Sequence, residues 1–106
     1  MAYLTIHSLP GSAEDLLASK QAHFDPVVRR VAPGFGALFS VTAPTPDGLL
    51  VVNVWEDAER VRAFTALPEM QAAQAEAQLP PPTSFQRYPG AVVEVFTGGP
   101  QDEPVN

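Results

Sequence analysis

Four segments of the chain have the residue pattern of β-strands, because they are rich in β-branched and aromatic residues and are bounded by proline and glycine. These segments are residues 3–9, 36–43, 49–55 and 91–96. In the first, Leu4 and Ile6 alternate with more polar residues, as in a strand with one buried face. Turn residues at 44–48 predict a hairpin of the second and third strands, and residues 80–90 predict an extended, proline-rich loop before the fourth.

After the first predicted strand, apolar residues recur at the spacing of a helix. Ser12 resembles a helix N-cap, because an aspartate follows it three residues later, and the sequence Pro-Gly at 33–34 ends the helix. Lys20 lies inside the apolar stripe of this helix, where it either extends towards solvent or points into a pocket. Pro26 interrupts the same segment, so the pattern predicts a kink or a restart near Phe24.

A second helical pattern opens at Glu56 and Asp57 and restarts at Pro68, and it continues to about Leu79. The order of elements is therefore βαββαβ, which predicts an α+β, ferredoxin-like fold: a four-stranded antiparallel sheet with its helices on one face. We expect a single domain over residues 1–96, followed by a flexible polar tail at 97–106.

The third predicted strand is apolar on both faces. Its one side carries Leu50, Val52 and Val54, and its other side carries Leu49, Val51 and Trp55. Two helical segments can cover only one face of a sheet, so the face with Leu50, Val52 and Val54 predicts contact with a partner. A second copy of the same chain is the simplest partner for a short single domain, and we expect a homodimer.

Composition and charge exclude several classes of function. The net charge of −6, with six basic residues that form no stripe, is unsuited to binding nucleic acid. No apolar run approaches the roughly 20 residues of a membrane span. The N-terminus lacks the pattern of a secretory signal, so we expect a cytoplasmic protein. The chain has no cysteine, and its histidines, His7 and His23, are far apart, which predicts no metal site.

The junction between the third strand and the second helix carries a resemblance. Residues 49–57 read Leu-Leu-Val-Val-Asn-Val-Trp-Glu-Asp, and Gly-Phe-Gly at 34–36 leads into the second strand. In these motifs and in the order of its elements, the segment 3–96 resembles the antibiotic biosynthesis monooxygenase-like family of the dimeric α+β barrel superfamily. The Trp-Glu-x-x-Glu junction of that family matches Trp55 to Glu59.

The resemblance implies two sheets packed face to face in a barrel, with a ligand cavity between the sheet and the helices of each subunit. Family members include cofactor-independent oxygenases of aromatic polyketides, small quinol oxygenases and haem-degrading enzymes. Thr65 stands where the haem-degrading branch has a histidine, which argues against that activity. The second helix also lacks the tyrosine and arginine of the polyketide oxygenases, so other functions stay open.

Three residues are candidates for catalysis. The amide of Asn53 lies in an apolar row, where it either donates to a substrate carbonyl or enolate or bonds to backbone or water. Trp55 either anchors the core or stacks on an aromatic ligand. His23, beside the predicted helix break, is the candidate base for a phenolic proton, unless it is a surface histidine. If Leu4 and Ile6 face the helices, His7 points into the dimer barrel and forms hydrogen bonds at the interface.

We expect a cofactor-independent monooxygenase that acts on a small aromatic, polyketide or quinol substrate and requires no cofactor. The alternatives are a non-oxidative cyclase or isomerase that stabilises an enolate in the same cavity, and a non-catalytic accessory protein that binds a small apolar or aromatic ligand. The residues expected to contact the ligand are Lys20, Phe24, Phe39, Val51, Phe64, Thr65 and Tyr88.

Overall fold

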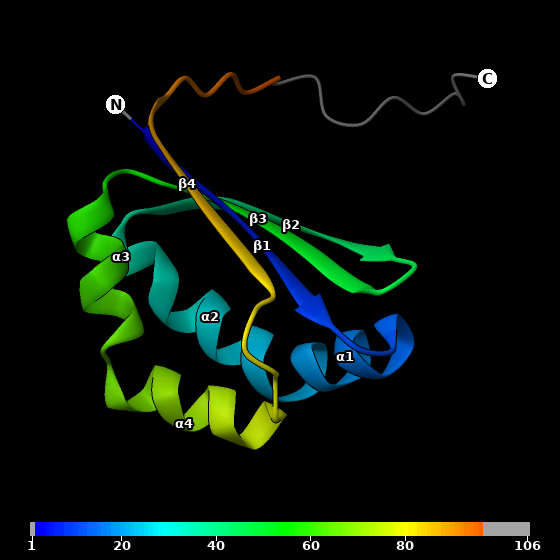
Figure 1. Cartoon of the computed structure of the whole chain (residues 1–106). Helices are drawn as coiled ribbons and strands as arrows, with labels where there is room; N and C mark the ends of the chain where they lie inside the picture. The colour runs from blue at the N-terminus through cyan, green and yellow to red at the C-terminus, as the bar shows by residue number, and fades with distance from the viewer. Residues whose placement is uncertain (1, 97–106) are drawn as a thin grey trace.

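The computed structural model of the chain describes residues 2–96. Strands and helices alternate along this segment, and all the helices lie on one side of the sheet (Figure 1). In chain order the elements are β1 (Ala2–Pro10), α1 (Ala13–Ser19), the π-helical turn η1 (Lys20–Phe24), α2 (Asp25–Val31), the 3₁₀ turn η2 (Ala32–Phe35), β2 (Ala37–Thr45), β3 (Gly48–Trp55), α3 (Ala58–Thr65), α4 (Pro68–Ala77) and β4 (Ser84–Ala91).

The sheet has four antiparallel strands in the order β2-β3-β1-β4. The predicted α+β, ferredoxin-like fold is therefore confirmed, as is the hairpin of β2 and β3. In the central pair of strands, Thr5 lies opposite Asn53 and His7 lies opposite Val51, so these four side chains share one face. This is the inner face of the sheet, which the helices cover.

The last strand was predicted in the wrong place. Residues 92–96 form no strand, and β4 lies in the segment that the sequence predicts to be a loop, with Ala91 as its last residue. After α4 only a short proline-rich linker remains, and its final residue, Thr83, donates its N–H to the carbonyl of Ser8 at 2.9 Å. Pairing with β1 therefore begins at Ser84.

The last residue of β4, Ala91, lies opposite Ala2 of β1. The residues that follow form no strand, and Val92 and Phe96 are 83% and 86% exposed. The predicted tail at 97–106 lies outside the described residues.

Sequence signals at the helix starts are confirmed by the structure. The side chain of Ser12 accepts a hydrogen bond from the N–H of Asp15 at 3.3 Å, and α1 begins at the next residue. The break expected near Phe24 is a π-helical turn, because a proline ring at position 26 would clash with the carbonyl of Ala22 in a regular α-helix. The wider turn avoids this clash and lets the helix continue.

Two buried clusters hold the helices to the inner face of the sheet. One contains Trp55 and Phe64 at one end of β3, and the other contains Leu49 and Val51 at the opposite end. Between them the row of the inner face is polar. None of the helices in residues 2–96 is long and apolar enough to cross a bilayer.

Candidate functional site

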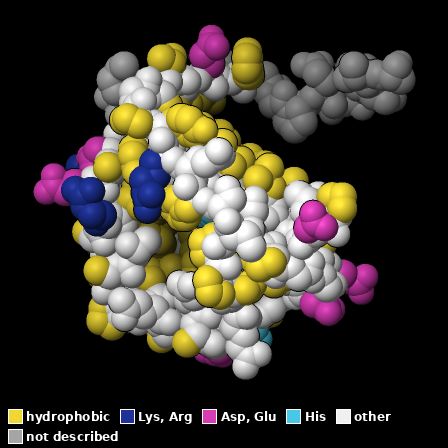
Figure 2. Space-filling model, in the orientation of Figure 1, with side chains coloured by type: hydrophobic (Ala, Val, Ile, Leu, Met, Phe, Trp, Pro, Cys, Tyr) yellow, Lys and Arg dark blue, Asp and Glu magenta, His cyan; other side chains and the backbone are white. Residues whose placement is uncertain are grey.

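A cavity of about 460 Å³ lies between the inner face of the sheet and the helices. It opens on the surface as a hollow lined with hydrophobic side chains (Figure 2). The residues that line it are Thr5, His7, Leu9, Lys20, Phe24, Asp25, Val28, Arg29, Ser40, Thr42, Val51, Asn53, Trp55, Val61, Phe64, Thr65, Gln74, Leu79, Pro80, Pro82 and Phe85. Its size suits a small organic molecule of two or three fused rings.

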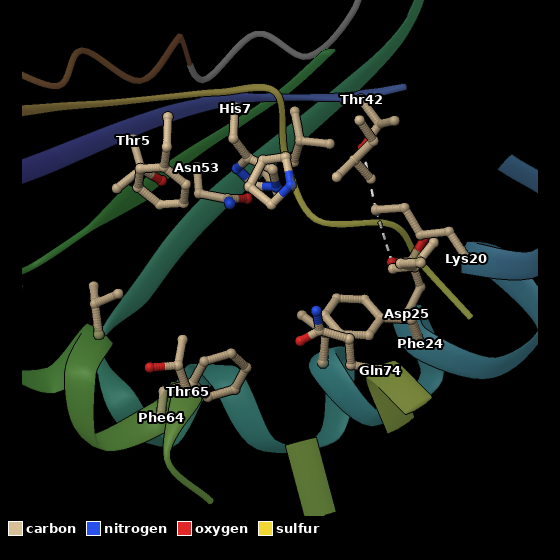
Figure 3. Close-up of a pocket in the computed structure, with 18 of the residues that line it drawn as sticks. Thr5, His7, Lys20, Phe24, Asp25, Thr42, Asn53, Phe64, Thr65 and Gln74 are labelled. Carbon is tan, nitrogen blue, oxygen red and sulfur yellow. Dashed lines mark hydrogen bonds and ion pairs between the residues drawn. The ribbon is translucent and has the colours of Figure 1, made fainter. Parts of the chain in front are cut away.

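The sheet supplies polar side chains to the cavity. In Figure 3, Thr5, Asn53 and His7 project from the strands towards the helices. The Asn53 side chain makes no hydrogen bond to any other residue within 2–96, although its neighbours on the same face of β3, Val51 and Trp55, are apolar. An amide that has no protein partner is free to bond to a ligand or to water.

His7 stands beside Asn53 in a more confined environment. Its ring stacks on Phe85, with 5.3 Å between the ring centroids and 8° between the planes. The Nδ1 atom of His7 is buried and has no hydrogen-bond partner, and no other buried side-chain nitrogen or oxygen atom among the described residues lacks one. Burial, and then the positive charge of Lys20, lower the pKa of His7 below its usual value of 6.5. The imidazole is therefore neutral at neutral pH.

The π-helical turn η1 places an ion pair at one end of the cavity. Lys20 Nζ lies 2.8 Å from Asp25 Oδ1 and 3.2 Å from Thr42 Oγ1 (Figure 3). The lysine is only 7% exposed, and these two partners supply hydrogen bonds to its buried ammonium group. Of the two alternatives for Lys20, the structure shows the second, since the side chain points into a pocket.

Aromatic rings form the other end of the cavity. The rings of Trp55 and Phe64 meet at 5.0 Å between centroids with an interplanar angle of 53°, and the ring of Phe35 also packs against Phe64, at 6.0 Å between centroids. Trp55 is 6% exposed and lines the cavity as well as belonging to a core cluster. Its two proposed roles, as core anchor and as pocket wall, are thus compatible.

Seven of the predicted site residues are brought together by the fold. Around the cavity lie Asn53, Trp55, Lys20, Phe24, Val51, Phe64 and Thr65. They come from β3, from the two ends of the π turn and from α3, which are the elements that the predicted βαββαβ order packs against one another.

Three predicted site residues lie outside the cavity. His23 is exposed, with Nδ1 3.5 Å from Glu76 Oε1, because the helix turns it away from the side on which Phe24 meets the sheet. Phe39 pairs with Val54 after a bulge in β2, and so lies on the outer face of the sheet, 49% exposed. Tyr88 is also on the outer face, since it belongs to β4 and pairs with Leu4.

His7 lines the cavity, although it was not predicted as a residue of the site. It was expected in the dimer barrel if Leu4 and Ile6 face the helices, but in the structure Leu4 and Ile6 lie on the outer face and His7 lies on the inner face. The signal that could have found it is the pairing of β1 with β3: His7 lies opposite Val51, on the face already assigned to the pocket. Among the described residues no group of three or more histidine, aspartate or glutamate side chains could hold a metal ion.

The same fold occurs in antibiotic biosynthesis monooxygenase-like proteins, which confirms the predicted resemblance at the level of the fold. No protein-family model and no curated protein sequence matches the chain. A proposed antibiotic biosynthesis monooxygenase from Chloroflexus aurantiacus superposes with a TM-score of 0.65 and 20% sequence identity, over 90% of this chain and 98% of that chain. A second, from Deinococcus radiodurans, gives 0.60 and 16%, over 91% and 99% of the two chains.

A third similar structure has a stated activity. SnoaB from Streptomyces nogalater, a cofactor-independent oxygenase, superposes with a TM-score of 0.53 and 12% identity, over 91% of this chain and 95% of that chain. Since one fold hosts many chemistries, the function of this chain has to be argued from its own cavity.

Proposed function

We propose that the protein is a cofactor-independent monooxygenase that oxidises a small phenolic, polyketide or quinol substrate in the cavity between sheet and helices. The observation that carries the proposal is the neutral imidazole of His7 beside the unbonded amide of Asn53, on the polar row between two apolar clusters. The likeness of fold to the cofactor-independent oxygenase SnoaB supports the same class of reaction.

Proton removal begins the proposed reaction. The neutral His7 imidazole takes the phenolic proton through Nε2, since Nδ1 is buried in the protein. Asn53 donates a hydrogen bond to the oxygen on which negative charge develops. The candidate base is thus His7 in place of His23, which lies outside the cavity.

Oxygen is the second substrate of the proposed reaction. The electron-rich anion gives one electron to O₂, and the two radicals combine to form a carbon–oxygen bond at the ring. The peroxide takes back the proton held by His7, and loss of water leaves a quinone, so one phenol and one O₂ give one quinone and one H₂O. Because its pKa is lowered, the His7 imidazolium is a good acid for this return step.

An oxygen electrode with an anthrone as substrate tests the proposal. We expect His7→Gln to lower kcat/KM by about 10²–10⁴-fold and Asn53→Ala by about 10²-fold. His23→Gln is the matched control, because it removes the other histidine of the chain, and it should leave the rate unchanged. Equal rates for wild type and His7→Gln would overturn the mechanism.

A non-oxidative cyclase or isomerase would use the same groups, since Asn53 and Lys20 also suit an enolate. The two reactions separate under strict anaerobiosis, where the monooxygenase stops and an isomerase continues. Conversion of the anthrone without oxygen would contradict the proposal.

We also propose that the outer face of the sheet meets a second copy of the chain. The only charged residue in the four strands, Arg87, pairs with Thr5 and so belongs to the inner face, which leaves the outer face uncharged. The outer face nevertheless exposes large apolar side chains, such as Phe39 at 49% and Val41 at 50%. In a twofold dimer this patch would meet itself, and an uncharged apolar patch does so without repulsion.

A further inference from the structure

The net charge of the side chains that line the cavity is opposite in sign to the net charge of the whole chain. The whole chain has a net charge of −6. The charged side chains that line the cavity are the basic Lys20 and Arg29 and a single carboxylate, that of Asp25. A cavity that is basic inside an acidic protein attracts small anions and orients them on entry.

One N–H of the Lys20 ammonium group has no acceptor within residues 2–96. An ammonium group has three donors, and the acceptors that it meets within residues 2–96 are two, Asp25 Oδ1 and Thr42 Oγ1. Its side chain is 9% exposed, so little water reaches the group. An oxygen of a ligand in the cavity would complete the set.

The π turn fixes the direction of this ammonium group. Asp25 donates its N–H to the carbonyl of Lys20, five residues earlier, and the two side chains also pair. In a regular α-helix, residues five apart point about 140° away from each other, so they could not form this pair. The turn therefore holds Lys20 on the cavity side, at the cost of a less regular helix.

Two arginines that form no ion pair within residues 2–96 flank the cavity. Arg29 lines it and forms no ion pair with another described residue, whereas its neighbour Arg30 lies 2.6 Å from Glu69 on α4. The guanidinium carbon of Arg87 lies 4.4 Å from the ring centroid of Phe85, the ring that stacks on His7. A cation, a ring and an imidazole thus form a column at the β4 edge of the cavity.

We propose that the substrate is an amphiphilic organic anion: a flat apolar body between the sheet and the helices, with one carboxylate directed at Lys20. This inference rests on the proposed function and adds the substrate class to it. The aromatic end at Trp55 and Phe64 takes the rings, and the basic end at Lys20 takes the acid group, while Asn53 and His7 lie between them at the reacting carbon.

The single tryptophan of the chain, Trp55, reports directly on binding because it lines the cavity. Quenching of its fluorescence by 2-naphthoate and by the uncharged 2-naphthamide compares an acid with a ligand of the same shape. We expect the naphthoate to bind about tenfold more tightly, the effect of one charge-assisted hydrogen bond.

Variants assign this preference to residues. The double variant Lys20→Met/Asp25→Asn removes both members of the buried pair, so that no lone charge stays behind, and it should lose the preference. Arg29→Gln should lower the preference for the naphthoate about threefold. Arg30→Gln changes the adjacent arginine, which pairs with Glu69, and it should leave this preference unchanged. A far-ultraviolet circular dichroism spectrum like that of wild type shows that each variant is folded.

Equal affinity for the two probes, quenching by neither, or a preference that survives in the double variant would each overturn the inference. Oxygen uptake separates this outcome from failure of the proposed function. A protein that prefers the naphthoate but oxidises no anthrone keeps the anion site and loses the monooxygenase. A protein that oxidises the anthrone without any preference for the naphthoate shows the reverse.

Discussion

The two faces of the sheet differ in chemistry although the same four strands build both. On the inner face, Thr5, His7 and Asn53 form a polar row between two apolar clusters, and a cavity lies above them. The outer face carries no charge and exposes Phe39 and Val41. The inner face thus has the chemistry of a ligand site and the outer face that of a protein interface.

The contrast shows how closely strand register and function are linked. Because successive side chains point to opposite faces, a shift of β1 by one residue would move His7 to the outer face and Ile6 into the cavity. Burial of the outer face would disfavour such a shift, because the shift would place Thr5 and His7 in an apolar interface. The proposed dimer would therefore also protect the site.

The strongest test of the comparison is a charge in the middle of the outer face. Val52→Lys should convert the proposed dimer to a monomer, because a twofold axis brings the new charge close to its own copy, at a cost of several kcal/mol. Light scattering at micromolar concentration measures this. Gln71→Lys, on the exposed surface of α4, is the control and should stay dimeric. A wild-type protein that is already monomeric contradicts the assignment of the outer face.

On the inner face the largest effect on stability is expected at Leu49, which is 1% exposed. Leu49→Ala should lower the free energy of unfolding by about 2–5 kcal/mol, because it leaves a cavity in the second cluster. Val92→Ala, at a residue 83% exposed, should change it by less than about 0.5 kcal/mol. Urea titrations at one protein concentration measure both values. Similar values for the two variants would show that the inner face is not the core.

The lowered pKa of His7 predicts a pH dependence of both activity and stability. The neutral imidazole is the proposed base, so kcat/KM should persist below pH 6.5 and fall only when the pH passes through the pKa of the folded state. In the unfolded chain His7 binds its proton near pH 6.5, so the free energy of unfolding should fall as the pH is lowered from that value.

The variant His7→Gln removes this contribution and should flatten the stability profile as the pH is lowered from about 6.5. His23→Gln should leave the profile as in wild type. A variant that loses His7 and keeps the wild-type slope would indicate that another group is responsible.

The smallest expected effect is on stability at Asn53. Asn53→Leu should leave the free energy of unfolding unchanged or raise it by up to about 1 kcal/mol, since the amide has no hydrogen-bond partner within residues 2–96 to lose. The same variant should lose oxygen uptake. A loss of stability above about 1 kcal/mol would instead support the structural alternative, in which the amide bonds to backbone or to ordered water.

The helices and three of the strands could be predicted from local sequence. Ser12, Asp57 and Pro68 mark helix starts by capping chemistry that needs no tertiary contact, and Asp57 Oδ1 accepts from the N–H of Arg60 at 2.9 Å as its position suggests. The fourth strand could not be predicted in this way. Its segment contains Pro89 and Gly90, which disfavour strands, and only the edge position beside β1 allows them.

The site was predictable only where a single element defines it. The alternation of β3 placed Val51, Asn53 and Trp55 together, as the structure confirms. His7 and Tyr88 depend on how two strands pair, and the side on which His23 lies depends on the rotation of the helix through the π turn. Such relations are set by tertiary contacts, and a local pattern does not contain them.

The π turn also affects how this chain is compared with others. A five-residue turn contains one residue more than a helix of the same length would need, so residues on its two sides are out of step by one position. When the chain is aligned with one whose helix lacks the turn, an alignment without a gap matches only α1 or only α2 correctly. A single gap between Lys20 and Asp25 aligns both α1 and α2 correctly, and it also aligns the two residues that the turn brings together.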